Sequence, residues 1–568
     1  MLGCTPVRTP LLLYVLALVV RGLLILQFPD PAYPDSAYYV DVARQIHAGH
    51  GLNVDFIWIF AEVGGSIPTN AVLTIPAFAH WMPLASLVQV PFLFVFGDVA
   101  WASDVPFALI GALAAPLAWA MARDVGARPL VAIGAGILTA LPLLSLPFMA
   151  QPDNFSLYQP LVVGSLWMAA RGLRGSPRSF ALAGLLAGVA TLARTDGVLV
   201  LLALGVVFAW DRTRAWRTPP MDAGGALIAA APPKPVIPIW AGVACLAVFV
   251  LVMAPWWARQ LLTFGSLSPS TASGKVLFIR DIGEWNSIAT PADLGHLLGM
   301  GIVPLIATRI GGFIAAAWIY LVLVCGVILG PTLAFGAWAR RRSPDFLPFF
   351  TYAAILFLFS GLVSAVHVPG GTFIHSAVAL APATYILALE GVAGAVAWVA
   401  VRRPAWKPLA ATRLFTSAAI AFSVAIALLG VGSVHGNWAA SRDRSTTIAT
   451  ALDDARVPLT DRVMSIDAGG LKYASGRGGV VLVNDPLAAI LQVAFAYDIR
   501  WVVLDRADSV ASVAPILDSD QRPAWIGRPI YSERGTGVNA DGTPQTYSLG
   551  IFPVCLNATF DPRCFSSP

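Results

Sequence analysis

The chain has 568 residues, of which 57% are hydrophobic and only 12% are charged, and its mean hydropathy is +0.74. Soluble domains carry about 25% charged residues, so this composition excludes a protein that is mainly water-soluble. The formal net charge of +5 comes from small basic clusters at the ends of apolar segments. Such clusters are typical of membrane topology and not of nucleic-acid binding.

Apolar segments that are long enough to cross a bilayer follow one another along the chain, because a spanning helix needs only about 20 residues. The first, at 11–28, is expected to be a retained span, since no small-residue cleavage site precedes the acidic loop after it. The other expected spans lie at 102–122, 130–148, 157–171, 179–194, 197–210, 239–257, 313–338, 346–366, 373–400 and 414–433. The sequence predicts an α-helical polytopic membrane protein with roughly eleven transmembrane helices.

Arginine clusters set the expected orientation. They fall at 122–128, 171–178, 340–342 and 401–408, all on one side of the predicted spans, and basic residues concentrate on the cytoplasmic side of membrane proteins. We therefore expect loops 29–101 and 258–300 to be extracytoplasmic, in a multi-pass protein of the inner (plasma) membrane.

Two predicted outer regions have structure of their own. The motif PDSAYYVDVARQIHAG predicts an amphipathic helix capped near Asp35 or Ser36, lying on the membrane surface with Asp41 on its solvated face. From residue 435 the pattern changes to β-like runs, at 480–483 and 500–505, that alternate with helical stretches. The predicted domains are thus a transmembrane module at 1–434, with both outer loops, and a small extracytoplasmic soluble α/β domain at 435–568.

Cysteine and glycine patterns offer little chemistry. Cys245 and Cys325 fall in apolar spans, whereas Cys555 and Cys564 would be able to pair in an oxidising compartment. No zinc spacing, Walker loop or dinucleotide glycine pattern occurs in the sequence, so chemistry on a soluble nucleotide is not expected.

Two aspartates in predicted outer segments are candidate catalytic groups. Asp35 in YPDSAYY stands beside tyrosines, among them Tyr38, that can form a wall for a sugar, and a half-buried carboxylate can deprotonate a hydroxyl acceptor. Asp153 in AQPDNF lies in the short turn after the third span. The alternative for each is a helix cap, at the start of the surface helix or of the fourth span.

Basic residues near the same face are candidates for binding a lipid-linked phosphate. Arg259, Lys275 and Arg280 belong to the loop at 258–300, and His375 begins the tenth span. They can equally serve attraction to anionic headgroups or, for His375, a buried contact. Arg194 and Asp196 in LARTDG can hold a polar headgroup or form a salt bridge that caps the turn.

Together these motifs carry a family resemblance. PDSAYY after the first span, Asp153 in the second outer turn, LARTDG, and PWWARQ before a basic loop each have a counterpart in the GT-C superfamily of membrane glycosyltransferases. This group includes bacterial aminoarabinose transferases and protein O-mannosyltransferases. The segments GGTFIHSAVALAP and VMSIDAGGLKYASGRGGVVLVNDP further resemble a bacterial subgroup, and the resemblance covers almost the whole chain.

The resemblance implies an enzyme that moves a sugar from a polyprenyl-phosphate donor to a lipid, glycan or protein acceptor at the outer face. It implies that Asp35 is the base and that Asp153 orients the acceptor or a divalent metal, with Arg259, Lys275, Arg280 and His375 near the donor phosphate and Arg194, Asp196 and Tyr38 in support. The chain departs from the family pattern at two points. A serine follows Asp35 where many members have a second acid, and FIHS replaces a later Arg-Tyr motif. The alternatives from other classes are a transporter of a lipid-linked or small polar substrate, and a non-catalytic scaffold or sensor.

Overall fold

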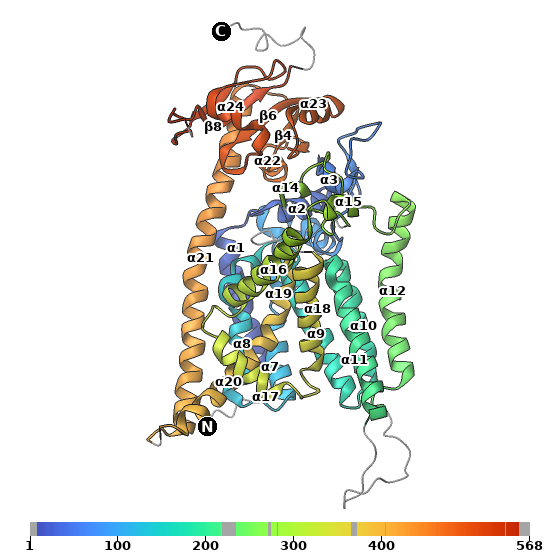
Figure 1. Ribbon diagram of the computed structural model, residues 1–568, viewed down its shortest axis with the longest axis vertical. Coiled ribbons are helices and arrows are strands. Elements are labelled where there is room, and N and C mark those ends of the chain that lie inside the picture. Colours follow the sequence, from blue (N-terminus) through green and yellow to red (C-terminus); the bar gives the residue numbers. More distant parts are fainter. Residues whose placement is uncertain are drawn as a thin grey trace, which may run out of the picture. The chain divides into compact units, whose positions relative to one another are not determined.

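The computed structural model describes residues 8–217, 235–270, 274–280, 282–364, 372–403, 405–539 and 541–555 (Figure 1). The described chain forms two compact units. The membrane unit comprises 1–29, 81–259 and 309–435, and the sheet unit comprises 30–80, 260–308 and 436–568. The predicted pair Cys555–Cys564 lies partly outside the described residues, because Cys564 is not among them.

The membrane unit is built from helices. Their bounds are α1 Arg8–Gln27, α4 Leu84–Leu87, α5 Val90–Phe96, α6 Val105–Gly111, α7 Ala114–Asp124, α8 Pro129–Ala140, α9 Phe155–Leu173, α10 Pro177–Ala193, α11 Val198–Arg217, α12 Ile239–Phe264, α16 Ile302–Ile319, α17 Gly330–Arg340, α18 Leu347–Leu358, α19 Thr372–Ala377, α20 Ala381–Ala400 and α21 Pro408–Asp454. The ends of α12, α16 and α21 extend into residues of the sheet unit. Figure 1 shows α9, α10 and α11 running side by side.

The described residues contain six helices that are long and apolar enough to cross a membrane: Arg8–Gln27, Ala100–Asp124, Ile239–Phe264, Ile302–Val324, Phe373–Ala400 and Pro408–Asp454. Shorter apolar helices, such as Pro177–Ala193 and Leu347–Val363, accompany them. Large apolar side chains on these helices are exposed, for example Leu262 at 88% and Leu429 at 80%. Exposure of this kind is stable in lipid and costly in water. The chain is a multi-pass membrane protein, as the sequence predicted.

One predicted span is interrupted. The sequence predicts a single helix at 313–338, but α16 continues only through a π-helical turn at Tyr320–Val324, and α17 begins at Gly330. Gly326 and Val327 between them have positive φ values of 55° and 66°, which a right-handed helix does not accept. Hydropathy could not reveal this break, because the residues around it are as apolar as the helices they separate.

Glycines allow α17 and α20 to pack closely. A Cβ atom added to Gly336 would overlap the carbonyl oxygen of Leu387, and one added to Gly391 would overlap that of Thr332. Without side chains at these two positions the helix backbones touch, which supports packing where no hydrophobic effect drives helices together.

The sheet unit contains a six-stranded sheet in the order β2-β5-β4-β6-β8-β7. Its strands are β2 Phe56–Ile57, β4 Arg462–Ser465, β5 Gly479–Val481, β6 Ile499–Asp505, β7 Tyr531–Arg534 and β8 Tyr547–Pro553. The first four in the order are parallel, and β8 and β7 are antiparallel to their neighbours. The predicted α/β character of the C-terminal region is confirmed.

Helices and a small hairpin-like pair complete this unit. They are α2 Pro34–His47, α3 Ile59–Glu62, α14 Ile282–Trp285, α15 Leu294–Leu298, α22 Ala468–Ser475, α23 Leu487–Ala496 and α24 Ala514–Ser519, with β1 Asn53–Val54 paired to β3 Ile75–Pro76. The helices α22 and α23 make the crossovers between parallel strands β4, β5 and β6, as short parallel strands require. The edge strand β2 comes from the predicted first outer loop, so residues far apart in the sequence share one sheet.

Candidate functional site

In the membrane unit, Asp153 lies in a buried polar cluster at the start of α9. Its side chain is fully buried, and its Oδ1 accepts a hydrogen bond from the backbone N–H of Asn154 at 2.5 Å. The Nδ1 atom of His375, from α19, lies 3.5 Å from Asp153 Oδ2 and 2.9 Å from Asn154 Oδ1. The imidazole also stacks on Phe155, with ring centroids 4.1 Å apart. Asn154 is the N-cap residue of α9, so Asp153 precedes the cap and does not form it.

A second polar pair is linked to this cluster through Ser376, the residue that follows His375. Arg194 and Asp196, in the turn between α10 and α11, form an ion pair with 2.7 Å between Nε and Oδ1. Ser376, which follows His375, donates a hydrogen bond to the other carboxylate oxygen of Asp196. Asp196 is nearly buried, so the pair removes the cost of an isolated charge at this depth. The salt-bridge interpretation of LARTDG is confirmed.

In the sheet unit, Asp35 is the second residue of α2. The helix starts after Tyr33, with Pro34 in its first turn, and Ser36 Oγ accepts a hydrogen bond from the Tyr33 backbone N–H. The predicted cap near Ser36 is confirmed, since Ser36 supplies the side chain of a capping box, although the N-cap residue itself is Tyr33. Asp35 is half-buried within the first turn, where the helix dipole favours a negative charge.

Tyr38, the predicted partner of Asp35, is fully buried one turn further along α2. Its hydroxyl donates to Glu62 Oε1 at 3.0 Å and accepts from the backbone N–H of Phe78 at 2.8 Å. Burial and the neighbouring Glu62 raise the pKa of Tyr38. Its ring packs edge-on against Phe56 and Phe78, so Tyr38 fixes the loop between α2 and β3.

Asp41 is buried, and the prediction that it lies on a solvated face is wrong. Burial and the nearby carboxylate of Asp55 raise the pKa of Asp41, while Lys472 and Arg44 partly offset them. Asp55 itself forms an ion pair with Lys472 at 2.6 Å. The helix pattern failed here because α22, which packs on α2 and carries Lys472, comes from the distant C-terminal region.

The three predicted cations of loop 258–300 have different surroundings. Arg259, near the end of α12 in the membrane unit, stacks over Trp256 with 5.2 Å to the ring centroid. Lys275 in the sheet unit is buried, and its Nζ donates to the backbone carbonyl of Ser287. Arg280 is exposed, and Glu284 Oε2 accepts a hydrogen bond from its backbone N–H at 2.8 Å. Arg280 is therefore the most accessible of the three.

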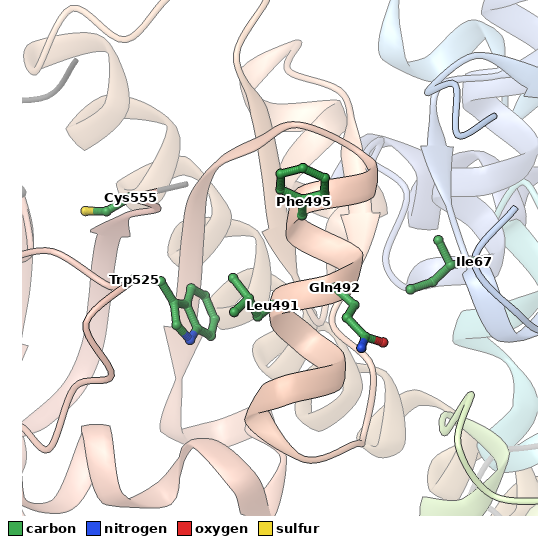
Figure 2. Close-up of a pocket in the computed structure, with 6 residues that line it drawn as sticks. All are labelled: Ile67, Leu491, Gln492, Phe495, Trp525 and Cys555. Carbon is green, nitrogen blue, oxygen red and sulfur yellow. The ribbon is translucent and has the colours of Figure 1, made fainter. Parts of the chain in front are cut away.

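The sheet unit also has an open apolar hollow with a volume of about 480 Å³ (Figure 2). Leu491, Gln492 and Phe495 of α23 line it together with Trp525, Ile67 and Cys555. In Figure 2, Leu491, Gln492 and Phe495 project from α23, with Trp525 and Cys555 to the left and Ile67 to the right. Phosphate and sugar sites require several convergent polar groups, so this hollow does not fit the predicted chemistry.

The predicted residues thus divide between the units. The membrane unit brings together Asp153 and His375, places Arg194 and Asp196 beside them through Ser376, and contains Arg259. The sheet unit contains Asp35, Tyr38, Lys275 and Arg280. Within the membrane unit, Asp153 and His375 supply a carboxylate oxygen and an imidazole nitrogen, which are suitable donors for a divalent metal.

Sequence reasoning missed several polar partners. Asn154 and Ser376 directly follow predicted residues, so their positions beside Asp153 and His375 were a usable signal. Glu62 and Asp485 had no such signal, because their partners lie in other segments.

Comparisons with known proteins agree with this architecture. The crystal structure of ArnT from Cupriavidus metallidurans bound to undecaprenyl phosphate superposes with a TM-score of 0.53 and 14% sequence identity, covering 97% of this chain and 98% of that chain. The apo structure of the same protein gives a TM-score of 0.52 and 15% identity, covering 96% and 97%. At such identity the likeness shows a shared fold.

A sequence family also matches. Residues 80–240 match the family model described as dolichyl-phosphate-mannose-protein mannosyltransferase. No curated protein sequence matches the chain. The chain has the GT-C fold of membrane glycosyltransferases. The family match covers residues 80–240, and over the rest of the chain the likeness to the solved structures is one of fold.

Proposed function

We propose that the protein transfers a sugar from a polyprenyl-phosphate donor to an acceptor hydroxyl at the extracytoplasmic face of the inner membrane. The observation that carries this proposal is the GT-C fold, shared over 97% of the chain with a protein crystallised with undecaprenyl phosphate. The family match to a mannosyltransferase that uses a dolichyl-phosphate sugar supports the same donor chemistry.

In the proposed reaction Asp35 removes the proton of the acceptor hydroxyl, whose oxygen attacks the anomeric carbon of the sugar. The bond between that carbon and the phosphate oxygen breaks, and polyprenyl phosphate leaves with the electron pair. The buried pair Asp153–His375 orients the acceptor or holds a divalent cation. Arg194 and Asp196 keep this region of the membrane unit in place through Ser376.

Cationic groups offset the charge of the leaving phosphate in this proposal. Arg259 and Arg280 are the stronger candidates, because the side chain of Arg259 is half-buried and that of Arg280 is exposed. His375 is a weaker candidate, because its Nδ1–H donates to Asn154 Oδ1 and the other ring nitrogen of a neutral imidazole has no proton to donate. Lys275 is also a weaker candidate, since its ammonium group already donates to Ser287.

The test is transfer in reconstituted proteoliposomes supplied with lipid-linked sugars from the native membrane. Asp35→Asn should lower the rate of transfer at least about 100-fold while binding of undecaprenyl phosphate is kept, because general bases contribute about 10²–10⁴ in rate. The exposed Asp541→Asn serves as control.

Two outcomes would contradict the proposal. Full transfer by Asp35→Asn would exclude Asp35 as the base. Solute movement across the vesicle membrane without any sugar transfer would identify a transporter instead. Mass spectrometry of envelope glycans and glycolipids from cells lacking the gene would reveal both the sugar and the acceptor through the species that disappears.

A further inference from the structure

Asp485 binds a single short segment of the predicted outer loop. It lies between β5 and α23, and its side chain is buried. Its carboxylate accepts hydrogen bonds from Ser287 Oγ at 2.5 Å, from the N–H of Ile288 at 2.7 Å and from the N–H of Ala289 at 3.2 Å. Hydrogen bonds to a charged acceptor are about twice as strong as neutral ones, so these three donors are firmly held.

The neighbouring Asn484 holds the same segment from its other end. Its backbone N–H donates to the carbonyl of Asn286 at 3.1 Å, and its side-chain amide donates to the carbonyl of Gly283 at 2.9 Å. Two consecutive residues after β5 therefore bind residues 283–289 by five hydrogen bonds. The ends of parallel strands are where open α/β sheets usually hold ligands, and here the place is taken by the chain itself.

Lys275 completes this arrangement. Its side chain is only 7% exposed, and its Nζ donates to the carbonyl of Ser287, the residue whose hydroxyl binds Asp485. Burial lowers the pKa of Lys275, and the charges of Asp485 and Glu284 partly restore it. The ammonium group is thus engaged with the backbone of the segment at Ser287.

The segment 283–289 also packs against another part of the sheet unit through the side chain of Trp285. Trp285 packs against Phe60, with ring centroids 5.0 Å apart, and against His80 and Trp58 at 5.8 and 6.1 Å. The segment is therefore fixed on one side by rings from residues 58–80 and on the other by Asn484 and Asp485.

We infer that Asp485 and Lys275 are positioning residues that lock segment 283–289, and that Lys275 does not bind the donor phosphate directly. The lock itself follows from the contacts above. The effect of the lock on the reaction rests on the proposed function. In that function the locked segment, through Glu284, keeps Arg280 in the conformation that binds the lipid phosphate.

Hydrogen exchange of the intact protein in nanodiscs tests the lock. Asp485→Asn should speed exchange of the Ile288 and Ala289 amides by about 10- to 100-fold, because a lost hydrogen bond to a charged group shifts local opening by that factor. Amides of β4 and β6 should exchange as in the wild type. Asp461→Asn is the matched control, since Asp461 accepts from the indole N–H of Trp501 and does not touch the segment. Unchanged exchange at Ile288 and Ala289 would overturn the inference.

Lys275→Met separates the two roles of the lysine. As a lock residue it should speed exchange in the same segment, and the double variant with Asp485→Asn should add little further. Weaker binding of undecaprenyl phosphate with unchanged exchange would instead make Lys275 a phosphate ligand and overturn the inference. This variant also keeps the test decisive if Asp485→Asn does not fold.

Kinetics test the link to the reaction. Asp485→Asn should raise the KM for the lipid donor about 10-fold and change kcat less than about threefold, and Asp485→Glu should recover part of the loss. If wild-type protein neither binds undecaprenyl phosphate nor transfers sugar, the proposed function fails while the exchange result still decides the lock. Faster exchange with an unchanged KM would refute the positioning role.

Discussion

Glu62 is a carboxyl group placed where the fold disfavours its charge. Only 5% of it is exposed, and its two oxygens accept hydrogen bonds from the Tyr38 hydroxyl and the Trp58 N–H. Burial raises the pKa of Glu62 to about 8, and these two hydrogen bonds only partly oppose the shift. In the unfolded chain the group has an ordinary pKa near 4.5. The folded state thus keeps a proton that the unfolded state releases.

The sign of the pH dependence follows from this difference. Between pH 4.5 and about 8 the folded state binds more protons, so its free energy of unfolding falls as the pH rises. Glu62→Gln should therefore flatten the decline and make the protein more stable than the wild type at pH 8, by on the order of 2 kcal/mol. Melting temperatures in detergent at pH 5, 6, 7 and 8 measure this. Asp498→Asn, at a side chain that is 60% exposed, is the control for a carboxylate outside the buried cluster. A parallel slope for Glu62→Gln would disprove the assignment.

At the scale of single residues, contacts between residues that are close in the sequence were the most predictable. The Arg194–Asp196 pair spans two positions, so its salt bridge was readable as a local motif. The burial of Asp41 was not readable, because α22, which packs on α2 and carries Lys472, lies far along the chain. The cluster at Asp153 was only partly predictable. Asp153 and His375 were both candidates, but the 3.5 Å between their side chains depends on packing between α9 and α19.

At the scale of helices, the close contact between α17 and α20 is the feature most sensitive to a methyl group. Gly336→Ala or Gly391→Ala would place a Cβ atom on a backbone carbonyl, and neither backbone can rotate away. Each substitution should lower the melting temperature in detergent and the yield of folded protein, by roughly 2 kcal/mol or more. Gly394→Ala is the control on the same helix, since its Cβ would lie at an ordinary 3.7 Å from Phe335. Equal effects at Gly394 and Gly391 would contradict the packing argument.

Most helices were predictable because a bilayer demands long apolar segments and the chain supplies them. Their ends were less predictable. The sequence placed a single span at 313–338, whereas positive φ values at Gly326 and Val327 divide it. Backbone conformations of this kind depend on tertiary packing, and here a Cβ on Gly326 would meet the side chain of Leu143. Composition alone contains no sign of that contact.

For the whole molecule, the sheet unit draws on three separate parts of the chain: 30–80, 260–308 and 436–568. The β-strands after residue 460 were predictable from alternating apolar runs, but the partnership with residues 56–57 was not, since a two-residue strand has no pattern of its own. The isolated segment 436–568 lacks the partner of β5 at one edge and the residues 283–289 that Asn484 and Asp485 bind.

A fusion experiment tests this composite character. Residues 436–568 alone should show weak protection of the β5 amides and broad thermal unfolding. Joining residues 30–80 to them through a flexible linker should restore protection at Gly479 and Val480, the partners of Phe56 and Ile57. The fusion with Ile57→Pro, which cannot complete the strand pair, should behave like the isolated segment. Full protection without residues 30–80 would show that the C-terminal segment folds by itself.

The pairing of β2 with β5 also constrains how the protein is made. Phe56 pairs with Gly479, about 420 residues further along the chain, so the ribosome completes almost every membrane helix before that pair can form. Until then, β2 lacks its neighbouring strand and α2 lacks the helix α22 that packs on it. Premature termination anywhere before residue 479 therefore leaves an inserted protein with an unfinished surface, which a quality-control protease can distinguish from the complete one.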